Sequence, residues 1–173
     1  MSAARELLER EGRSAVTMRR LADSLGVQAP SLYKHVSDKD ELEAALAELA
    51  LEELAAAFAG APSLEEAARR YRAWALDHPH LYRLTTERAR PDGARPAGGR
   101  DRVEAPLLAV VGDEHRARAA WAFAHGMVEL ELAGRVPDAA GAWRAGVEAF
   151  TGAPARAPRP APERSVFRSF RVD

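Results

Sequence analysis

The sequence contains no cysteine, and this absence removes several kinds of chemistry at once. Disulfide bonds, thiolate nucleophiles and zinc sites made of cysteine are excluded, which is typical of proteins from a reducing compartment. No apolar run approaches the roughly 20 residues that span a bilayer, and the N-terminus lacks the apolar core of a secretory signal. We therefore expect a cytoplasmic protein that has no membrane partner and is stabilised by packing alone.

A large excess of one charge is also missing. The net charge is −1 and the pI is near 6.5, which argues against a protein that coats nucleic acid along its whole surface. Residues 13–39 are nevertheless basic, because five cations occur there with two acids, and 5 − 2 leaves +3. A local basic patch of this kind is enough to dock on DNA phosphates. The cations are Arg13, Arg19, Arg20, Lys34 and Lys39, and the acids are Asp23 and Asp38.

The 173 residues contain no internal repeat, no glycine-rich phosphate loop and no strand-like alternation. Apolar residues, 47% of the chain, instead recur at the three- and four-residue spacing of amphipathic helices. We predict an all-α protein of about nine helices, in which an N-terminal three-helix unit precedes a helical bundle. Neither a cofactor nor a metal site is predicted.

Residues 16–42 carry the pattern of a helix-turn-helix DNA-binding unit. Thr17 can cap the first helix, and Val16 and Leu21 are placed to form a hydrophobic staple across that cap. Gly26 follows the last apolar residue of this helix, at the position where a left-handed glycine commonly ends a helix. A tight turn at this point would hold the second helix rigidly.

The second helix is predicted at residues 28–36, with Pro30 in its first turn, where a missing N–H group costs little. Leu32 and Val36 form its inward face. A capping box at residues 38–41 then starts a third helix. The outward positions offer hydrogen-bonding, small and cationic groups that can enter a major groove, namely Gln28, Ala29, Ser31, Tyr33, Lys34 and His35.

The segment TMRRLADSLGVQAPSLYKHVSDKDEL, residues 17–42, closely resembles the DNA-binding segment of TetR-type bacterial transcriptional regulators. The resemblance covers residues 6–49 and implies that residues 28–36 form a recognition helix. It also implies contacts with DNA, mostly with its backbone, from Thr17, Tyr33, Lys34, His35 and Lys39. We add as candidate DNA-binding residues Arg19, Gln28, Ala29 and Ser31.

Two features depart from the family pattern. Gln28 stands where the family usually has Ser or Thr, and glutamine caps a helix less well but can pair bidentately with adenine. We therefore expect Gln28 to help set the operator sequence. The first helix, from Ser2, looks shortened by a turn or two, so either the true start lies upstream or a phosphate contact is missing.

The C-terminal half continues the resemblance more faintly, because Trp121, His125 and Gly126 look like the W, H, G signature of one TetR ligand-domain subfamily. Two apolar stripes, within residues 121–132 and 143–150, lie on the last two predicted helices. In TetR-like proteins these two helices form a four-helix dimer contact. The resemblance therefore implies a homodimer, whose paired recognition helices would read a palindromic operator in double-stranded DNA.

A small-molecule effector usually binds among the helices of this half in the family. The candidate effector-binding residues are Tyr71, Trp74, Tyr82, Trp121 and His125. Packing in a core or an interface is the plainer interpretation of Trp121. His125 is open to three interpretations: a core histidine bonded to a carbonyl, a ligand-sensing donor, or a metal ligand together with Glu129 four residues later.

Further helices are predicted at residues 40–59, 63–78, 81–88, 104–111, 113–135 and 137–150. Pro106 would lie in the first turn of its helix, and residues 89–100 have the composition of a mobile loop. We divide the chain into a DNA-binding domain (1–45), a ligand-binding and dimerisation domain (46–152) and a tail (153–173). The tail is predicted to be disordered.

These features favour a ligand-responsive transcriptional regulator, in particular a repressor that leaves its operator when an effector shifts the bundle. Two other classes stay open. One is a helical interaction module that keeps the fold without binding an operator. The other is a small helical metalloenzyme that uses His78, His80 and His125, although the sequence offers no nucleophile beside a base, no Glu-x-x-His pair and no cofactor fingerprint.

Overall fold

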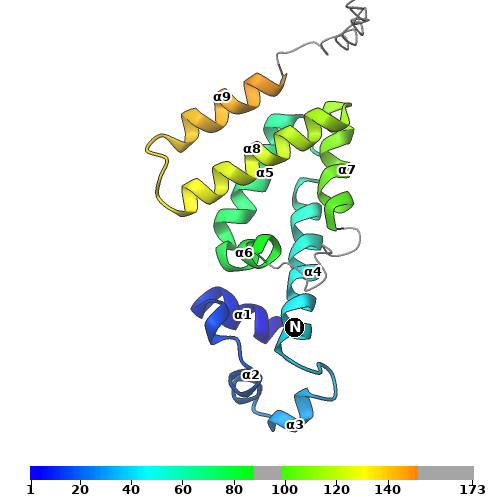
Figure 1. The fold of residues 1–173 in the computed structure, drawn as a ribbon, viewed down its shortest axis with the longest axis vertical. Coiled ribbons are helices and arrows are strands. Elements are labelled where there is room, and N and C mark those ends of the chain that lie inside the picture. Colours follow the sequence, from blue (N-terminus) through cyan, green and yellow to red (C-terminus); the bar gives the residue numbers. More distant parts are fainter. Residues whose placement is uncertain (88–98, 152–173) are drawn as a thin grey trace, which may run out of the picture.

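The computed structural model describes residues 1–87 and 99–151, which form nine α-helices and one short 3-10 helix (Figure 1). No strand occurs in these two ranges, and the prediction of an all-α protein is confirmed. The predicted loop up to residue 98 and the predicted tail at residues 153–173 lie outside the described residues. Within the part that is described, no helix is long and apolar enough to cross a bilayer.

The molecule is elongated, and the helix-turn-helix occupies one end of it (Figure 1). Helix α4 leads from this end into the bundle, where α5 to α9 gather, and α9 lies at the far end. The helices are α1 (Ser2–Glu11), the 3-10 helix η1 (Arg13–Ala15), α2 (Met18–Leu25), α3 (Ala29–Leu32), α4 (Lys39–Phe58), α5 (Leu64–Asp77), α6 (Pro79–Glu87), α7 (Gly99–Val111), α8 (Glu114–Leu132) and α9 (Ala139–Thr151).

Side-chain caps start the two helices that lead into the bundle. Asp38 caps α4 by accepting a hydrogen bond from the Glu41 N–H at 2.8 Å, and the Glu41 carboxylate accepts one from the Ser37 N–H at 2.6 Å. Ser63 caps α5 by accepting from the Glu66 N–H at 3.2 Å. The Glu66 carboxylate pairs with two arginines of the next turn.

Three helix starts differ from the prediction by two residues or more, and one of them is that of α9, which begins at Ala139 instead of residue 137. Helix α6 begins at Pro79, two residues before the predicted start, and α7 begins at Gly99, five residues before its predicted start. Pro106 therefore lies inside α7 and not in its first turn, where it removes one helical hydrogen bond. The glycines and prolines before α7 favour a loop locally, but α7 packs against α4 and α8, and such packing overrides weak local preferences.

One apolar core extends from the end formed by α1, α2 and α3, which is called the DNA-binding end after the sequence prediction, through α4 into the bundle. Leu42 and Leu46, on the first turns of α4, are 1% and 0% exposed and join the core of α1 and α2. Phe58, at the other end of α4, is 1% exposed and belongs to the same core. Because α4 contributes side chains to the core at both of its ends, continuous packing connects the two ends of the molecule.

Candidate DNA-binding surface and effector site

The helix-turn-helix is held by the cap and the turn that the sequence predicts. Thr17 Oγ1 accepts a hydrogen bond from the N–H group three residues later at 3.2 Å. Gly26 ends α2 in the left-handed conformation, with φ of 65°, which a residue with a side chain rarely adopts. Leu25 and Val27 on either side of it are 49% and 40% exposed, so an apolar edge lies beside the turn.

The recognition helix is shorter than predicted. Regular helix covers Ala29–Leu32 instead of residues 28–36, and the chain then continues in turns. The Leu32 carbonyl accepts hydrogen bonds from both the His35 N–H at 2.9 Å and the Val36 N–H at 3.0 Å. Leu32 and Val36 are half-buried and pack against the core, so the predicted inward face is kept although the last turn is not regular helix.

The candidate DNA-binding residues lie at the outer end of the molecule, on and around α2 and α3 (Figure 1). Tyr33 is 52% exposed, and Gln28 precedes α3 without capping it through its side chain. This surface therefore presents a phenol, an amide, a hydroxyl and an imidazole to a partner. Also exposed are Arg19, Ser31, Lys34 and His35, whereas Thr17, Ala29 and Lys39 are half-buried.

A buried carboxylate holds two of the cations that the sequence assigns to the basic patch. Arg13 donates to both carboxylate oxygens of Glu43 at 2.7 and 3.1 Å. Lys39 Nζ lies 3.6 Å from the same carboxylate, and Glu43 is 2% exposed. These contacts fix η1 against the first turns of α4, so Arg13 and Lys39 stabilise the fold of the DNA-binding end.

A third cation is paired as well. Arg20 donates to Glu11 at 2.5 Å, and this hydrogen bond holds the pKa of the Glu11 carboxyl below its usual value. When Glu11, Glu43 and Arg10, which also pairs with Glu11, are added to the earlier count, 6 − 4 leaves +2 instead of +3. Among the described residues, Arg19 and Lys34 form no ion pair, and both are exposed.

Three of the candidate effector-binding residues form a chain of hydrogen bonds inside the bundle. The hydroxyls of Tyr71 on α5 and Tyr82 on α6 lie 3.1 Å apart, and Tyr82 Oη lies 2.5 Å from His125 Nδ1 on α8. Trp121, one turn before His125, stacks on its ring with 5.7 Å between centroids and 8° between planes. This tyrosine–histidine chain therefore joins three helices.

Burial keeps both phenols of the chain protonated. Tyr71 and Tyr82 are 5% and 0% exposed. Burial raises the pKa of Tyr71 to about 12 and raises the pKa of Tyr82 as well. The Glu129 carboxylate raises both pKa values further. The two tyrosines are therefore neutral hydroxyl groups at physiological pH.

Trp74 does not join this chain. It is 9% exposed on α5, and in the described residues its ring contact is with His78, edge-on at 5.4 Å between centroids. The structure thus brings together four of the five candidates, namely Tyr71, Tyr82, Trp121 and His125.

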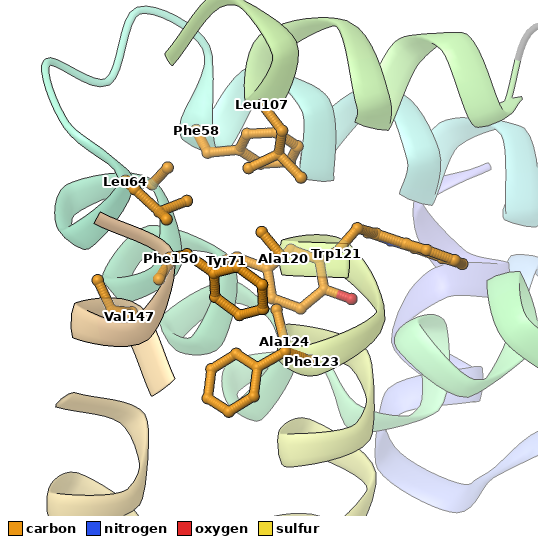
Figure 2. A pocket seen from close by; sticks show the side chains of 12 residues that line it. Phe58, Leu64, Tyr71, Leu107, Ala120, Trp121, Phe123, Ala124, Val147 and Phe150 are labelled. Carbon is orange, nitrogen blue, oxygen red and sulfur yellow. The ribbon is translucent and has the colours of Figure 1, made fainter. Parts of the chain in front are cut away.

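A small apolar cavity adjoins Tyr71 (Figure 2). Its volume is about 20 Å³, which is room for one water-sized group, and its walls come from α4, α5, α7, α8 and α9. Phe58, Phe123 and Phe150 are its other aromatic members besides Trp121, whose ring extends away from the void in Figure 2. Sequence patterns assign such residues to packing, since a cavity wall and a core position have the same apolar spacing.

The DNA-binding end meets the bundle at a polar joint between α1 and α6. Glu9 on α1 accepts hydrogen bonds from the backbone N–H groups of Leu81 at 2.8 Å and His80 at 3.4 Å, at the start of α6. A carboxylate is favoured there, because the first N–H groups of a helix have no partner within it. Tyr82 follows directly in the chain, so α6 is held at one point by α1 and at the next by the tyrosine–histidine chain.

Arg5 makes a second contact at this joint. It donates to Glu53 on α4 at 3.0 Å and lies 3.4 Å from His78 Nε2. Sequence patterns miss these contacts, because Glu9 and Leu81 are 72 residues apart. The local signal is that α6 starts at a proline that no Ser, Thr or Asp precedes, so its first N–H groups need an acceptor from elsewhere.

The metal-site interpretation gains no support. In the described residues, no group of three or more His, Asp or Glu side chains could hold a metal ion. His78 lies near Arg5, and the His80 N–H group is held by Glu9, whereas His125 is bonded within the bundle. The histidines of the metalloenzyme interpretation therefore serve separate contacts.

Known proteins resemble both halves of the chain. Residues 1–46 match the family described as bacterial regulatory proteins, tetR family, and residues 64–150 match the tetracyclin repressor-like, C-terminal domain. An uncharacterized HTH-type transcriptional regulator of Mycobacterium tuberculosis, Rv0681, is 29% identical over 76% of this chain and 67% of its own length.

Solved structures share the fold of the chain. The regulatory protein SCO4313 is 26% identical, with a TM-score of 0.71 over 88% of this chain and 93% of its own. A variant of TetR from Acinetobacter baumannii AYE, solved in complex with minocycline, is 27% identical, with a TM-score of 0.61 over 87% of this chain and 91% of its own.

Proposed function

The chain belongs to the TetR family of bacterial regulatory proteins, and we propose that it is a repressor that binds a palindromic operator as a homodimer and releases it when a small-molecule effector enters the bundle. The observation that carries the proposal is the exposed polar face that follows the Gly26 turn. The family supports a DNA-binding transcriptional regulator rather than an enzyme. The sign of regulation, the operator and the effector belong to the proposal.

We propose that residues 1–45 form the DNA-binding domain and residues 46–152 the ligand-binding and dimerisation domain. In the first, Gln28 would read a base in the major groove, because its amide matches the hydrogen-bonding edge of adenine. Tyr33 and Lys34 would position the protein on the phosphate backbone. The remaining contacts are assigned to Thr17, Arg19, Ala29, Ser31, His35 and Lys39.

The dimer contact is proposed on the outer face of α8 and α9. On α8, Ala119 and Ala122 are exposed, and Leu130 is 43% exposed. Nothing lies within 4 Å of a β-carbon built at Gly126. These positions share one helix face, and their small side chains allow a second helix to approach closely. A two-fold dimer would place two recognition helices about one DNA turn apart.

Release by the effector is proposed to pass through α6. Tyr82 on this helix bonds to His125 in the bundle, and the N–H groups just before it are held by Glu9 on α1. A displacement of Tyr82 would therefore move a helix that is fixed to the DNA-binding end. An effector that favours a different position of α6 would change the spacing of the two recognition helices, so that both no longer fit one operator.

Selection of bound duplexes from a random library, followed by gel shift, tests the proposal. We expect the purified protein to enrich a palindrome with half-sites about one helical turn apart, and to bind it more weakly as salt rises. The double variant Tyr33→Ala, Lys34→Ala serves as the control that keeps the fold and loses affinity. Dimeric protein that enriches no sequence would contradict the proposal.

A helical interaction module is the second candidate function. The short α3 and the reduced net charge of +2 favour it, because both features weaken the expected contact with DNA. The same selection separates the two, since an interaction module would fold and dimerise but retain no duplex.

A further inference from the structure

One carboxylate oxygen inside the bundle has no partner. Glu129 Oε1 on α8 is buried and takes part in no hydrogen bond among the residues that the structure describes. Folded proteins leave few buried polar atoms without a hydrogen bond, because the atom has lost its water and gained nothing in return. A hydrogen-bond donor from outside the chain would satisfy this oxygen.

The neighbouring carboxylate on α8, that of Glu131, has the hydrogen-bond partners that Glu129 Oε1 lacks. Glu131, two residues later, accepts hydrogen bonds from Arg72 at 2.9 Å and from Trp143 Nε1 at 3.1 Å. Both oxygens of Glu131 are therefore satisfied by α5 and α9. Glu129 has no such cation, since none of the described arginines, lysines or histidines forms an ion pair with it.

Two aromatic rings lie on the same face of α8 as this carboxylate. Trp121, His125 and Glu129 are spaced by four residues on α8 and therefore share one face. The rings of Trp121 and His125 are stacked, and the Tyr82 ring from α6 lies 5.9 Å from that of His125. The hydroxyl of Tyr82 is already engaged with His125 and Tyr71, so it is not the donor that Glu129 lacks.

The charge of Glu129 acts on this part of the bundle. After burial itself, its carboxylate is one of the reasons why the pKa values of Tyr71 and Tyr82 are raised. The carboxylate is therefore close to both phenols, and one of its two oxygens is shielded from water. A negative charge beside aromatic faces is an environment that favours a cation.

We propose that the face formed by Trp121, His125 and Glu129, with Tyr82 beside it, binds an effector that carries a protonated amine on a flat apolar body. The ammonium group donates to the buried oxygen Glu129 Oε1 and neutralises the carboxylate, while the apolar body lies against the aromatic rings. A neutral donor would complete the hydrogen bond but leave the charge uncompensated. The inference rests on the proposed function only in naming this ligand as the effector.

Three probes of equal size test the charge preference: benzylamine, which is protonated at pH 7, benzyl alcohol and benzoate. Tryptamine and 2-naphthylmethylamine extend the series to two-ring bodies. Binding to the full chain is followed by tryptophan fluorescence, because Trp121 is part of the site, and by thermal melting. We expect an amine to bind at least about tenfold more tightly than the matching alcohol, and benzoate not to bind. Equal binding of amine and alcohol, tighter binding of benzoate, or no saturable binding of any amine would overturn the proposal.

The isosteric change Glu129→Gln removes the charge and keeps the shape. In this variant the affinity for the amine should fall to that for the alcohol. The matched control is Glu114→Gln, the same change at an exposed position on the first turn of α8, which should keep the amine preference. If Glu129→Gln does not fold, the probe series on the unaltered chain still decides the question.

Adding the probes to the protein–operator complex separates this inference from the proposed function. Release of the operator by amines supports both. Release by alcohols or anions but not by amines leaves the repressor in place and refutes the amine site. Amine binding that depends on Glu129, in a protein that selects no DNA sequence, supports the site and refutes the repressor.

Discussion

The DNA-binding end and the bundle hold their candidate functional residues in opposite ways. At the DNA-binding end, Tyr33 and Lys34 are neighbours in the sequence and both are exposed. In the bundle, Tyr71, Tyr82 and His125 come from three helices, and the two phenols are buried and bonded in one chain. We therefore expect changes at the first end to alter binding without altering stability, and changes in the chain to alter stability first.

The largest effect is expected from replacing Tyr33 and Lys34 together by Ala. Operator affinity should fall about a hundredfold, since two DNA contacts worth roughly 1–2 kcal/mol each are lost. The loss should be similar on every operator variant, because backbone contacts carry no sequence information. Fluorescence anisotropy measures the affinity, and thermal melting should stay within about 2 °C, as expected for exposed positions. A large fall in melting temperature would refute the separation of binding from stability.

Alkaline pH should weaken the bundle by a somewhat smaller amount. Tyr71 has a pKa of about 12 in the folded protein, against the ordinary value of 10.0, so between these pH values the unfolded chain loses a proton that the folded chain keeps. The stability is therefore complete below pH 10 and is lost as the pH rises through 12, by roughly 2–3 kcal/mol. Denaturant unfolding at pH 8 and pH 11 measures about half of this loss, because pH 11 lies midway between the two pKa values. Tyr71→Phe should reduce the pH dependence, whereas Tyr33→Phe, at an exposed phenol, should leave it unchanged.

The change Tyr82→Phe breaks the chain at its centre. It removes the hydroxyl that bonds to Tyr71 and His125, and the loss of partners inside the bundle should cost roughly 1–3 kcal/mol of unfolding free energy. Operator affinity of the folded protein should remain within about threefold. Denaturant unfolding and anisotropy, with Tyr33→Phe as control, measure both. Unchanged stability would mean that the two hydrogen bonds do not hold the three helices together.

The smallest effect is expected from Gln28→Ala. It should cost about tenfold in affinity at one base pair of each half-site and nothing at the others, because one bidentate amide–adenine contact is lost. Repeating the selection from a random library with the variant shows which position becomes degenerate. Equal losses on every sequence would contradict a base-reading role for Gln28.

Caps and turns could be predicted because each depends on a few neighbouring residues. Thr17 and Asp38 cap their helices as expected, and Gly26 adopts the left-handed conformation at the expected turn. The length of α3 could not be predicted in the same way. Its sequence permits helix up to residue 36, and Val36 does pack against the core, but regular helix ends at Leu32 and the chain continues in turns.

Most of the features that could not be predicted from the sequence depend on contacts between residues that are far apart in the chain. The charge of the DNA-binding end was overestimated, because Glu43 lies 30 residues from Arg13 and outside the basic segment. The contact of Glu9 with the start of α6 and the unpartnered oxygen of Glu129 depend on tertiary packing alone. A charge or a carboxylate is visible in a sequence, but its partner is not.

The ion pairs of Arg13, Arg20 and Lys39 with acidic neighbours have a consequence for a protein surrounded by a chromosome. Bulk DNA is bound through charge alone, and it offers millions of competing sites for each operator. Because Arg13, Arg20 and Lys39 are held in ion pairs, the cations that this end presents without an acidic partner in the described residues are Arg19 and Lys34. Few molecules should therefore be sequestered on random DNA, so a small number of dimers is enough to keep one operator occupied.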